Sequence, residues 1–301
     1  NLTKNDGLQD SSAYDRESLN LRWDRAVADD AVLKTVFAAT TVDQRHVGTL
    51  NTREYNEAPK TNNIPFSYRK VEAYRLSTSY EKEVGNSLIS ITPYYRDNSM
   101  KIIPSWSVSY DATQYDSKSQ SIGFLSKYRH DFEPLRARLI VGLDFDLSPG
   151  SRDEDSLRLT RTTNALGGKT YAYDTASAPI KIYQYDVTYR SISPYVHGEI
   201  SPTENLRLIG GLRYDDMQFD YKNTLNGGSV SAVQGYANFV GPVWFGRVAD
   251  TKIGYSHWGP KLGATYALSK ETSVFANYAN SFRTPSESQL FRPSSGANAN
   301  L

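Results

Sequence analysis

The chain contains no cysteine, only 2 methionines and only 4 histidines among its 301 residues. The missing thiols exclude disulfide bonds, thiolate metal sites and a cysteine nucleophile. Its 34 basic and 33 acidic residues leave a net charge of +1, so no global positive field favours nucleic acid as a partner. The densest apolar run is the five-residue stretch 139–143, whereas a helix that spans a membrane needs about 20 apolar residues. A helical membrane bundle is therefore excluded.

Aromatic residues are abundant, with 22 tyrosines, 11 phenylalanines and 4 tryptophans, and this content argues against disorder. The clearest local pattern lies in 137–147, where apolar residues occupy every second position and Arg138, Asp144 and Asp146 fall between them. A period of two predicts a strand with one apolar and one polar face. Weaker versions of this pattern bring the prediction to about ten strands, at 17–27, 32–43, 70–82, 87–96, 119–132, 137–147, 183–200, 206–215, 258–268 and 273–283.

The connections between these strands alternate in length. Short turns at 28–31, 84–86, 133–135, 201–205 and 269–272 alternate with long polar segments at 44–69, 97–118, 148–182 and 222–256. This regularity predicts antiparallel hairpins, with the turns at one end of the sheet and the loops at the other. It is typical of bacterial outer-membrane barrels, which have an apolar outer band and a polar lumen. By strand parity, mutually compensating charges should line that lumen: Arg136, Arg138, Asp144, Asp146, Arg207, Arg213 and Asp215.

Three segments carry a resemblance to a known family. Residues 206–215 read LRLIGGLRYD, residues 256–263 read SHWGPKLG, and residues 274–285 read VFANYANSFRTP, followed by Leu290 and Phe291. In this order they resemble the barrel strands of TonB-dependent outer-membrane receptors, and the terminal NANL at 298–301 is similar to the family's N-P-x-L with Ala299 in place of proline. The resemblance implies an all-β, antiparallel transmembrane barrel of 22 strands, of which residues 1–301 would supply about ten. We expect an internal piece of that barrel domain, without the plug.

The resemblance also implies a function, namely ligand-gated active uptake of a ferric siderophore or a similarly large, scarce nutrient across the outer membrane of a Gram-negative bacterium. Energy would come from the TonB–ExbB–ExbD complex through the plug, the outer wall would contact outer-membrane lipid, and no cofactor is expected beyond the transported iron chelate. Two alternatives remain open. One is a passive porin-like channel, and the other is a soluble β-sandwich module that binds glycans.

Candidate ligand-binding residues lie in the predicted long loops. Arginine offers a planar fork of donors, and aromatic rings offer flat faces, so together they suit a carboxylate or an aromatic iron chelate. The candidates are Arg45, His46, Tyr55, Arg158, Arg161, Tyr171, Tyr173, Trp244 and Arg247.

The same sequence offers little for catalysis or metal binding. Ser193 and His197 share one predicted strand, but four residues of strand separate them by about 13 Å, which is too far for a nucleophile and its base. The acidic run 153–155 is expected to be a hydrated part of a loop. We therefore expect neither an enzyme nor a metal site.

Overall fold

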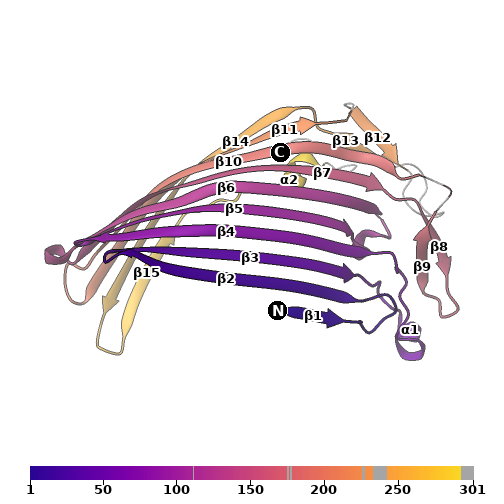
Figure 1. Ribbon diagram of the computed structural model, residues 1–301, viewed down its shortest axis with the longest axis horizontal. Helices are drawn as coiled ribbons and strands as arrows, with labels where there is room; N and C mark the ends of the chain where they lie inside the picture. The colour runs from indigo at the N-terminus through magenta and orange to yellow at the C-terminus, as the bar shows by residue number, and fades with distance from the viewer. Residues whose placement is uncertain (111, 175, 177, 226–227, 233–242, 293–301) are drawn as a thin grey trace.

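In the computed structural model, 11 strands form one antiparallel sheet that curls into an open trough (Figure 1). The structure describes residues 1–301 except 111, 175, 177, 226–227, 233–242 and 293–301, and for 229–232 and 243–244 it describes the backbone alone. The strands of the sheet, neighbour by neighbour, are β1 (Leu2–Asn5), β2 (Tyr14–Ala28), β3 (Ala31–Arg45), β4 (Tyr68–Val84), β5 (Ser87–Ile103), β6 (Thr113–Phe132), β7 (Ala137–Ser156), β10 (Ile180–Ile200), β11 (Leu206–Asn223), β14 (Thr251–Ala267) and β15 (Ser273–Ala279). All ten predicted strands are present.

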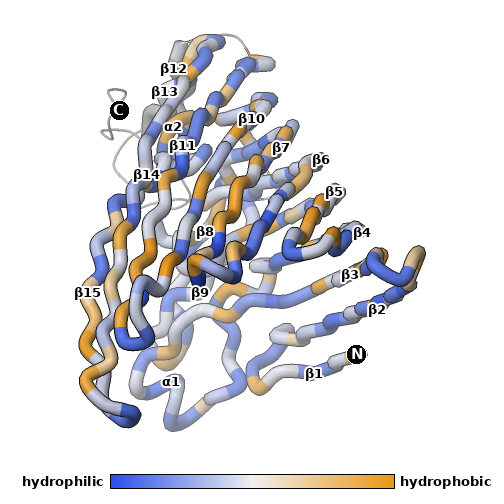
Figure 2. Tube along the Cα trace, turned by 90° about the vertical axis from the view of Figure 1, so that its left-hand side faces the viewer, coloured by the Kyte–Doolittle hydropathy of each residue, from blue (hydrophilic) through white to orange (hydrophobic). Residues whose placement is uncertain are grey.

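The loops contain elements that the sequence did not predict. Two small hairpins stand apart from the sheet, β8 (Leu159–Thr163) with β9 (Lys169–Tyr173), and β12 (Gly228–Ala232) with β13 (Val243–Arg247). Two short helices, α1 (Thr52–Glu57) and α2 (Glu287–Phe291), lie in the first long loop and after β15. Figures 1 and 2 together place α1 and the β8–β9 hairpin at the long-loop end, over the space that the trough encloses.

The convex face of the wall is apolar, as the alternation predicts. Val141 in β7 lies opposite Val196 in β10, and Val196 lies opposite Leu212 in β11, so the three side chains form one row. They remain 37–40% exposed, so neither a second sheet nor a helix buries them in the described part of the chain. The β-sandwich alternative requires such faces to pack against a second sheet, and it is wrong.

The concave face is polar, and its charges compensate one another. Arg213 in β11 reaches across β10 to Asp144 in β7, with 2.7 Å between Nη1 and Oδ2, and its Nε lies 2.7 Å from Asp215. Other ion pairs of the wall join Arg96 to Asp146, Arg138 to Asp131 and Arg207 to Glu199. Arg136 differs from its prediction, because it lies in the turn after β6 with a φ of +45° and contacts Glu204 at 3.5 Å. It belongs to the short-turn end, outside the lumen wall.

Several strands are longer at the loop end than predicted. β5 continues to Ile103 and β6 begins at Thr113, so most of the predicted loop 97–118 is strand. Likewise β7 reaches Ser156 and β14 begins at Thr251. Beyond the apolar band both faces of a barrel strand meet water, so the apolar alternation stops there although the hydrogen-bond ladder continues. β15 ends earlier than predicted, at Ala279, because the following chain turns away from the wall.

Candidate functional site at the long-loop end

The long loops pack together into a small apolar core of their own. Its buried residues come from the loop before β4, from the β5–β6 connection, and from the β8–β9 hairpin with its flanks: Ile64, Ile103, Val108, Ala112, Leu157, Leu159 and Tyr171. Phe66 and Tyr68 pack against them. We call this assembly, with α1, the cap. Loops that share a core are positioned relative to one another before any ligand arrives, which lowers the cost of ordering them on binding.

A buried carboxylate joins two segments of the cap. Glu54 in α1 is 1% exposed. Its Oε2 accepts from the backbone N–H of Asn51 at 2.8 Å, and its Oε1 accepts from the side-chain amides of Asn63 at 2.9 Å and Asn164 at 2.6 Å. Gly168 packs so closely that a Cβ there would lie 1.6 Å from Oε1. The first bond completes the capping box of α1, and the third ties α1 to the β8–β9 hairpin.

The protonation state of Glu54 follows from these contacts. Burial by itself would raise its pKa, but the hydrogen bonds from Asn51, Asn164 and Asn63 outweigh burial and hold the pKa below its ordinary value. A carboxyl group with a lowered pKa stabilises the fold fully above its unfolded pKa, and this contribution is lost as the pH falls through the folded pKa. The cap is therefore held by a charged carboxylate at neutral pH.

We expect acid to loosen the cap selectively. Between about pH 6 and about pH 3, protection of the α1 backbone amides from hydrogen exchange should fall, after correction for the intrinsic exchange rate. Glu54→Gln provides the control, because it cannot titrate. An equal loss of protection in Glu54→Gln would show that other groups cause the acid response.

Four of the predicted ligand residues come together at the cap. The guanidinium of Arg45 lies 5.9 Å from the centre of the Tyr68 ring, and the ring of Tyr173 lies 4.6 Å from that of Phe66. Burial is the main cause that raises the pKa of Tyr173, and the neighbouring Tyr68 adds to it. The charge of Arg45 acts in the opposite direction, and the resulting pKa is about 12. The Tyr173 phenol is therefore protonated at neutral pH.

His46 and Tyr171 complete this group, and both are more enclosed. The ring of His46 lies 5.9 Å from that of Trp106, which is 64% exposed. Burial and the charge of Arg69 lower the pKa of His46, so its imidazole is neutral at neutral pH. Tyr171 is a buried member of the cap core, so its side chain has a packing role.

The other predicted residues lie outside this group, although Tyr55, Arg158 and Arg161 belong to segments of the cap. Tyr55 is 69% exposed on α1, Arg158 forms a 3.5 Å ion pair with Asp174, and Arg161 lies opposite Tyr171 in the β8–β9 hairpin. Arg247 donates to the backbone carbonyls of Ile182 at 3.0 Å and Lys181 at 2.9 Å, which anchors β13 to β10. The side chain of Trp244 lies outside the described residues. Ligand contact by any of the nine residues stays a prediction.

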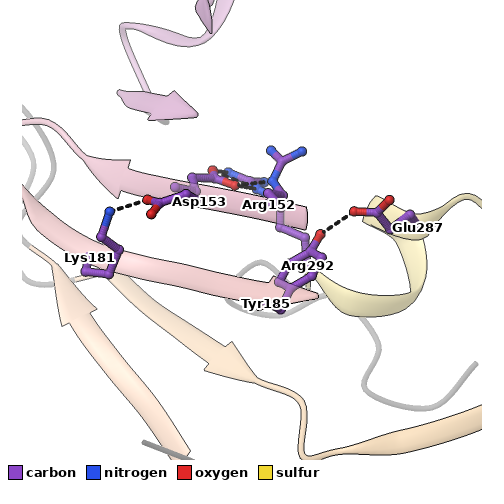
Figure 3. Close-up of polar contacts among 7 residues, drawn as sticks. Arg152, Asp153, Lys181, Tyr185, Glu287 and Arg292 are labelled. Carbon is purple, nitrogen blue, oxygen red and sulfur yellow. Dashed lines mark hydrogen bonds and ion pairs between the residues drawn. The ribbon is translucent and has the colours of Figure 1, made fainter. Parts of the chain in front are cut away.

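Sequence reasoning missed a second cluster, on the concave face near the long-loop end. Ile182, Tyr183, Tyr185, Val187, Phe219, Tyr221, Phe245 and Phe291 form it. Beside it, Glu154 is fully buried and accepts from Arg152 and Arg292. Lys181 pairs with Asp153 (Figure 3) and also with Asp155. The expectation of a hydrated acidic loop at 153–155 is therefore wrong, because all three residues lie in β7 and Glu154 is fully buried. The sequence held one signal of this pair, because residues two apart in a strand, such as Arg152 and Glu154, lie on the same face.

Nearer the middle of the concave face lies a cavity of about 800 Å³. It is bounded by side chains from strands as far apart as β4 and β14 and by the chain after β15, including Glu81, Lys127, Arg213, His257 and Phe282. In the described part of the chain, no group of three or more His, Asp or Glu side chains is arranged to hold a metal ion. No helix among the described residues is long and apolar enough to cross a membrane.

Comparison with solved structures shows the fold. The ferric citrate transporter FecA superimposes with a TM-score of 0.65 at 14% identity, over 89% of this chain and 36% of that one. The ferric-catecholate import receptor Fiu from E. coli gives 0.63 at 13% identity, over 90% and 47%. The copper transporter OprC gives 0.64 at 13% identity, over 96% and 41%. The chain thus spans less than half the length of each.

Comparison with curated proteins finds no match. A family model described as "TonB dependent receptor-like, beta-barrel" matches residues 3–301. A family of receptors agrees with the expectation that the chain is not an enzyme. The chain belongs to the TonB-dependent receptor family and forms part of its transmembrane β-barrel.

Proposed function

We propose that the receptor containing this chain takes up a ferric siderophore across the bacterial outer membrane, driven by the TonB–ExbB–ExbD complex. The observation that carries the proposal is the cap, a preorganised group of loops that holds Arg45, Tyr68 and Tyr173 together over the polar trough. A guanidinium beside aromatic rings suits a negatively charged, aromatic chelate. FecA and Fiu, which share the fold, are described as handling ferric citrate and ferric catecholate.

A porin-like channel is the second candidate. It shares the apolar outer face and the polar lumen, but it has no need for loops joined through a buried carboxylate such as Glu54 or for a chain segment lying along the inner wall, such as α2. The two candidates differ in their need for energy, and this difference can be measured.

The test is uptake by cells whose own iron receptors have been deleted and which express the whole receptor, with or without TonB. The probes are iron-55 bound to citrate, to a synthetic tricatecholate and to a synthetic trihydroxamate. We expect uptake of at least one chelate to be about tenfold faster with TonB than without it. Equal uptake in both strains would establish passive passage, and no uptake in either would refute transport of ferric chelates.

A further inference from the structure

The chain after β15 leaves the wall and runs along its concave face. β15 pairs with β14 from Ala267 to Lys261, and a final bond joins the N–H of Asn280 to the carbonyl of Pro260 at 3.0 Å. β14 continues to Thr251, and among the described residues no strand pairs with this continuation on that side. The ring of Phe282 lies 4.6 Å from that of His257, on the wall of the central cavity. We call residues 280–292 the strap.

The far end of the strap is anchored in the aromatic cluster near the long loops. Phe291, the last residue of α2, is fully buried, and its ring stacks on Tyr221 with 4.4 Å between centroids and 18° between planes. The hydroxyl of Tyr185 donates to Glu287 at 2.9 Å (Figure 3). α2 has only five residues, and an isolated helix of that length is unstable in water. Its conformation therefore depends on docking to the wall.

An ion pair completes the anchor. The guanidinium of Arg292 donates two hydrogen bonds to Oε1 of Glu154 in β7, from Nε at 2.9 Å and from Nη2 at 2.6 Å. Glu154 is fully buried, and Arg152 donates to its other oxygen at 2.8 Å (Figure 3). Arg152 in turn lies 4.0 Å from the centre of the Tyr115 ring. If Arg292 moved away, Arg152 would remain to compensate the buried carboxylate, so the wall could tolerate a released strap.

The strap and the wall strands are held in place by different kinds of contact. Every wall strand is joined to its neighbours by a ladder of backbone hydrogen bonds. Beyond the Asn280 bond to Pro260, the described backbone–backbone hydrogen bonds of the strap run only within α2 and its N-cap, and the described contacts of residues 281–292 with the wall are made by side chains. Such a segment can detach without opening the barrel, because no ladder has to break.

We propose that the strap is a releasable inner gate, which Arg292–Glu154 and Phe291 hold against the wall and which moves when bulky cargo passes through the lumen. This inference rests on the proposed transport function. The strap lies on the inner face between the cap and the central cavity, so its docked position narrows the route that connects them. Energy delivered through TonB would release it.

The experiment measures release directly and needs no ligand. Because residues 1–301 lack cysteine, a thiol can be introduced at Leu290, which packs partly buried on the aromatic cluster, in an otherwise cysteine-free whole receptor. The probe is a negatively charged, membrane-impermeant maleimide applied to cells with or without TonB. Ile253→Cys is the matched reporter, since Ile253 packs on the same cluster but belongs to β14. Arg292→Gln weakens the anchor, and Arg190→Gln, at an exposed wall arginine bonded to Gln218, is its control.

We expect Leu290→Cys to be labelled about tenfold faster with TonB than without it. Arg292→Gln should raise labelling without TonB to about the same rate, and Arg190→Gln should not. Ile253→Cys should respond to neither change. Equal labelling of Leu290→Cys in both strains, or an equal increase at both reporters in Arg292→Gln, would overturn the gate. Uptake of chelates is measured separately, so the two proposals can fail independently. TonB-dependent uptake with unchanged labelling of Leu290→Cys would refute the proposal that the strap is a gate. TonB-dependent labelling without uptake would refute the proposal that ferric chelates are the substrate.

Discussion

Replacing Val141 by arginine is expected to destabilise the folded barrel by about 2–4 kcal/mol, because the new charge would face hydrocarbon at the centre of the apolar band. Val141 lies in the outward row with Val196 and Leu212. The 20 residues of β7 exceed the roughly 10 that a strand needs to cross the membrane, and Val141 is the fifth residue from its short-turn end. Unfolding of the whole receptor by urea in phospholipid vesicles, followed by tryptophan fluorescence, measures this loss.

The neighbouring residue supplies the control. Ile140 points to the opposite face, where it lies opposite His197, and both residues border the central cavity. Arginine at 140 would therefore meet water and the acidic side chains of the concave face, and we expect it to cost a small fraction of the effect at 141. Equal destabilisation by the two arginines would mean that the convex face of β7 does not contact lipid, and the orientation of the wall would have to be reversed or abandoned.

The sequence predicted the wall well because the wall obeys a local rule. A strand between lipid and a wet lumen must alternate at every second residue, and the stretch 137–147 shows this without any knowledge of its neighbours. The rule fails where the environment becomes the same on both faces. Toward the long-loop end of β5 and β6, the face that carries Tyr95 and Ile122 becomes polar, and the sequence predicted these parts to be loop. The polar residues on that face are Asp97, Ser99, Lys101, Asp116 and Lys118.

The cap and the strap could not be predicted in this way, because long-range contacts define them. Glu54 and Asn164 are 110 positions apart, and Glu154 and Arg292 are 138 apart. Residue type drew attention to Arg45 and Tyr173 but could not distinguish them from Tyr171, which packs in a core, or from Arg247, which binds backbone carbonyls. Side chains with identical chemistry thus have different roles according to contacts that only the folded chain reveals.

The contact at Glu54 predicts the second large effect. Glu54→Ala would leave the N–H of Asn51 and the amides of Asn63 and Asn164 without their acceptor in a buried site, at a cost of about 3 kcal/mol or more to cap docking. The ladder of the wall would be unaffected, so the barrel should stay folded while the cap opens. Trypsin applied to the whole receptor should then cleave after Arg53 and Lys60 much faster than in the wild type, with an unchanged urea midpoint for the wall.

Glu57→Ala is the matched control on the same helix. Glu57 is exposed and contacts Arg53 at 3.2 Å, one turn away, and such a surface pair contributes at most about 0.5 kcal/mol. Its loss should leave cleavage of the cap close to the wild-type rate. If Glu54→Ala is also cleaved at that rate, then the apolar core around Ile64 and Leu159 holds the cap without the carboxylate. If Glu54→Ala unfolds the wall as well, cap and barrel form one cooperative unit, and the loops cannot open independently to admit a ligand.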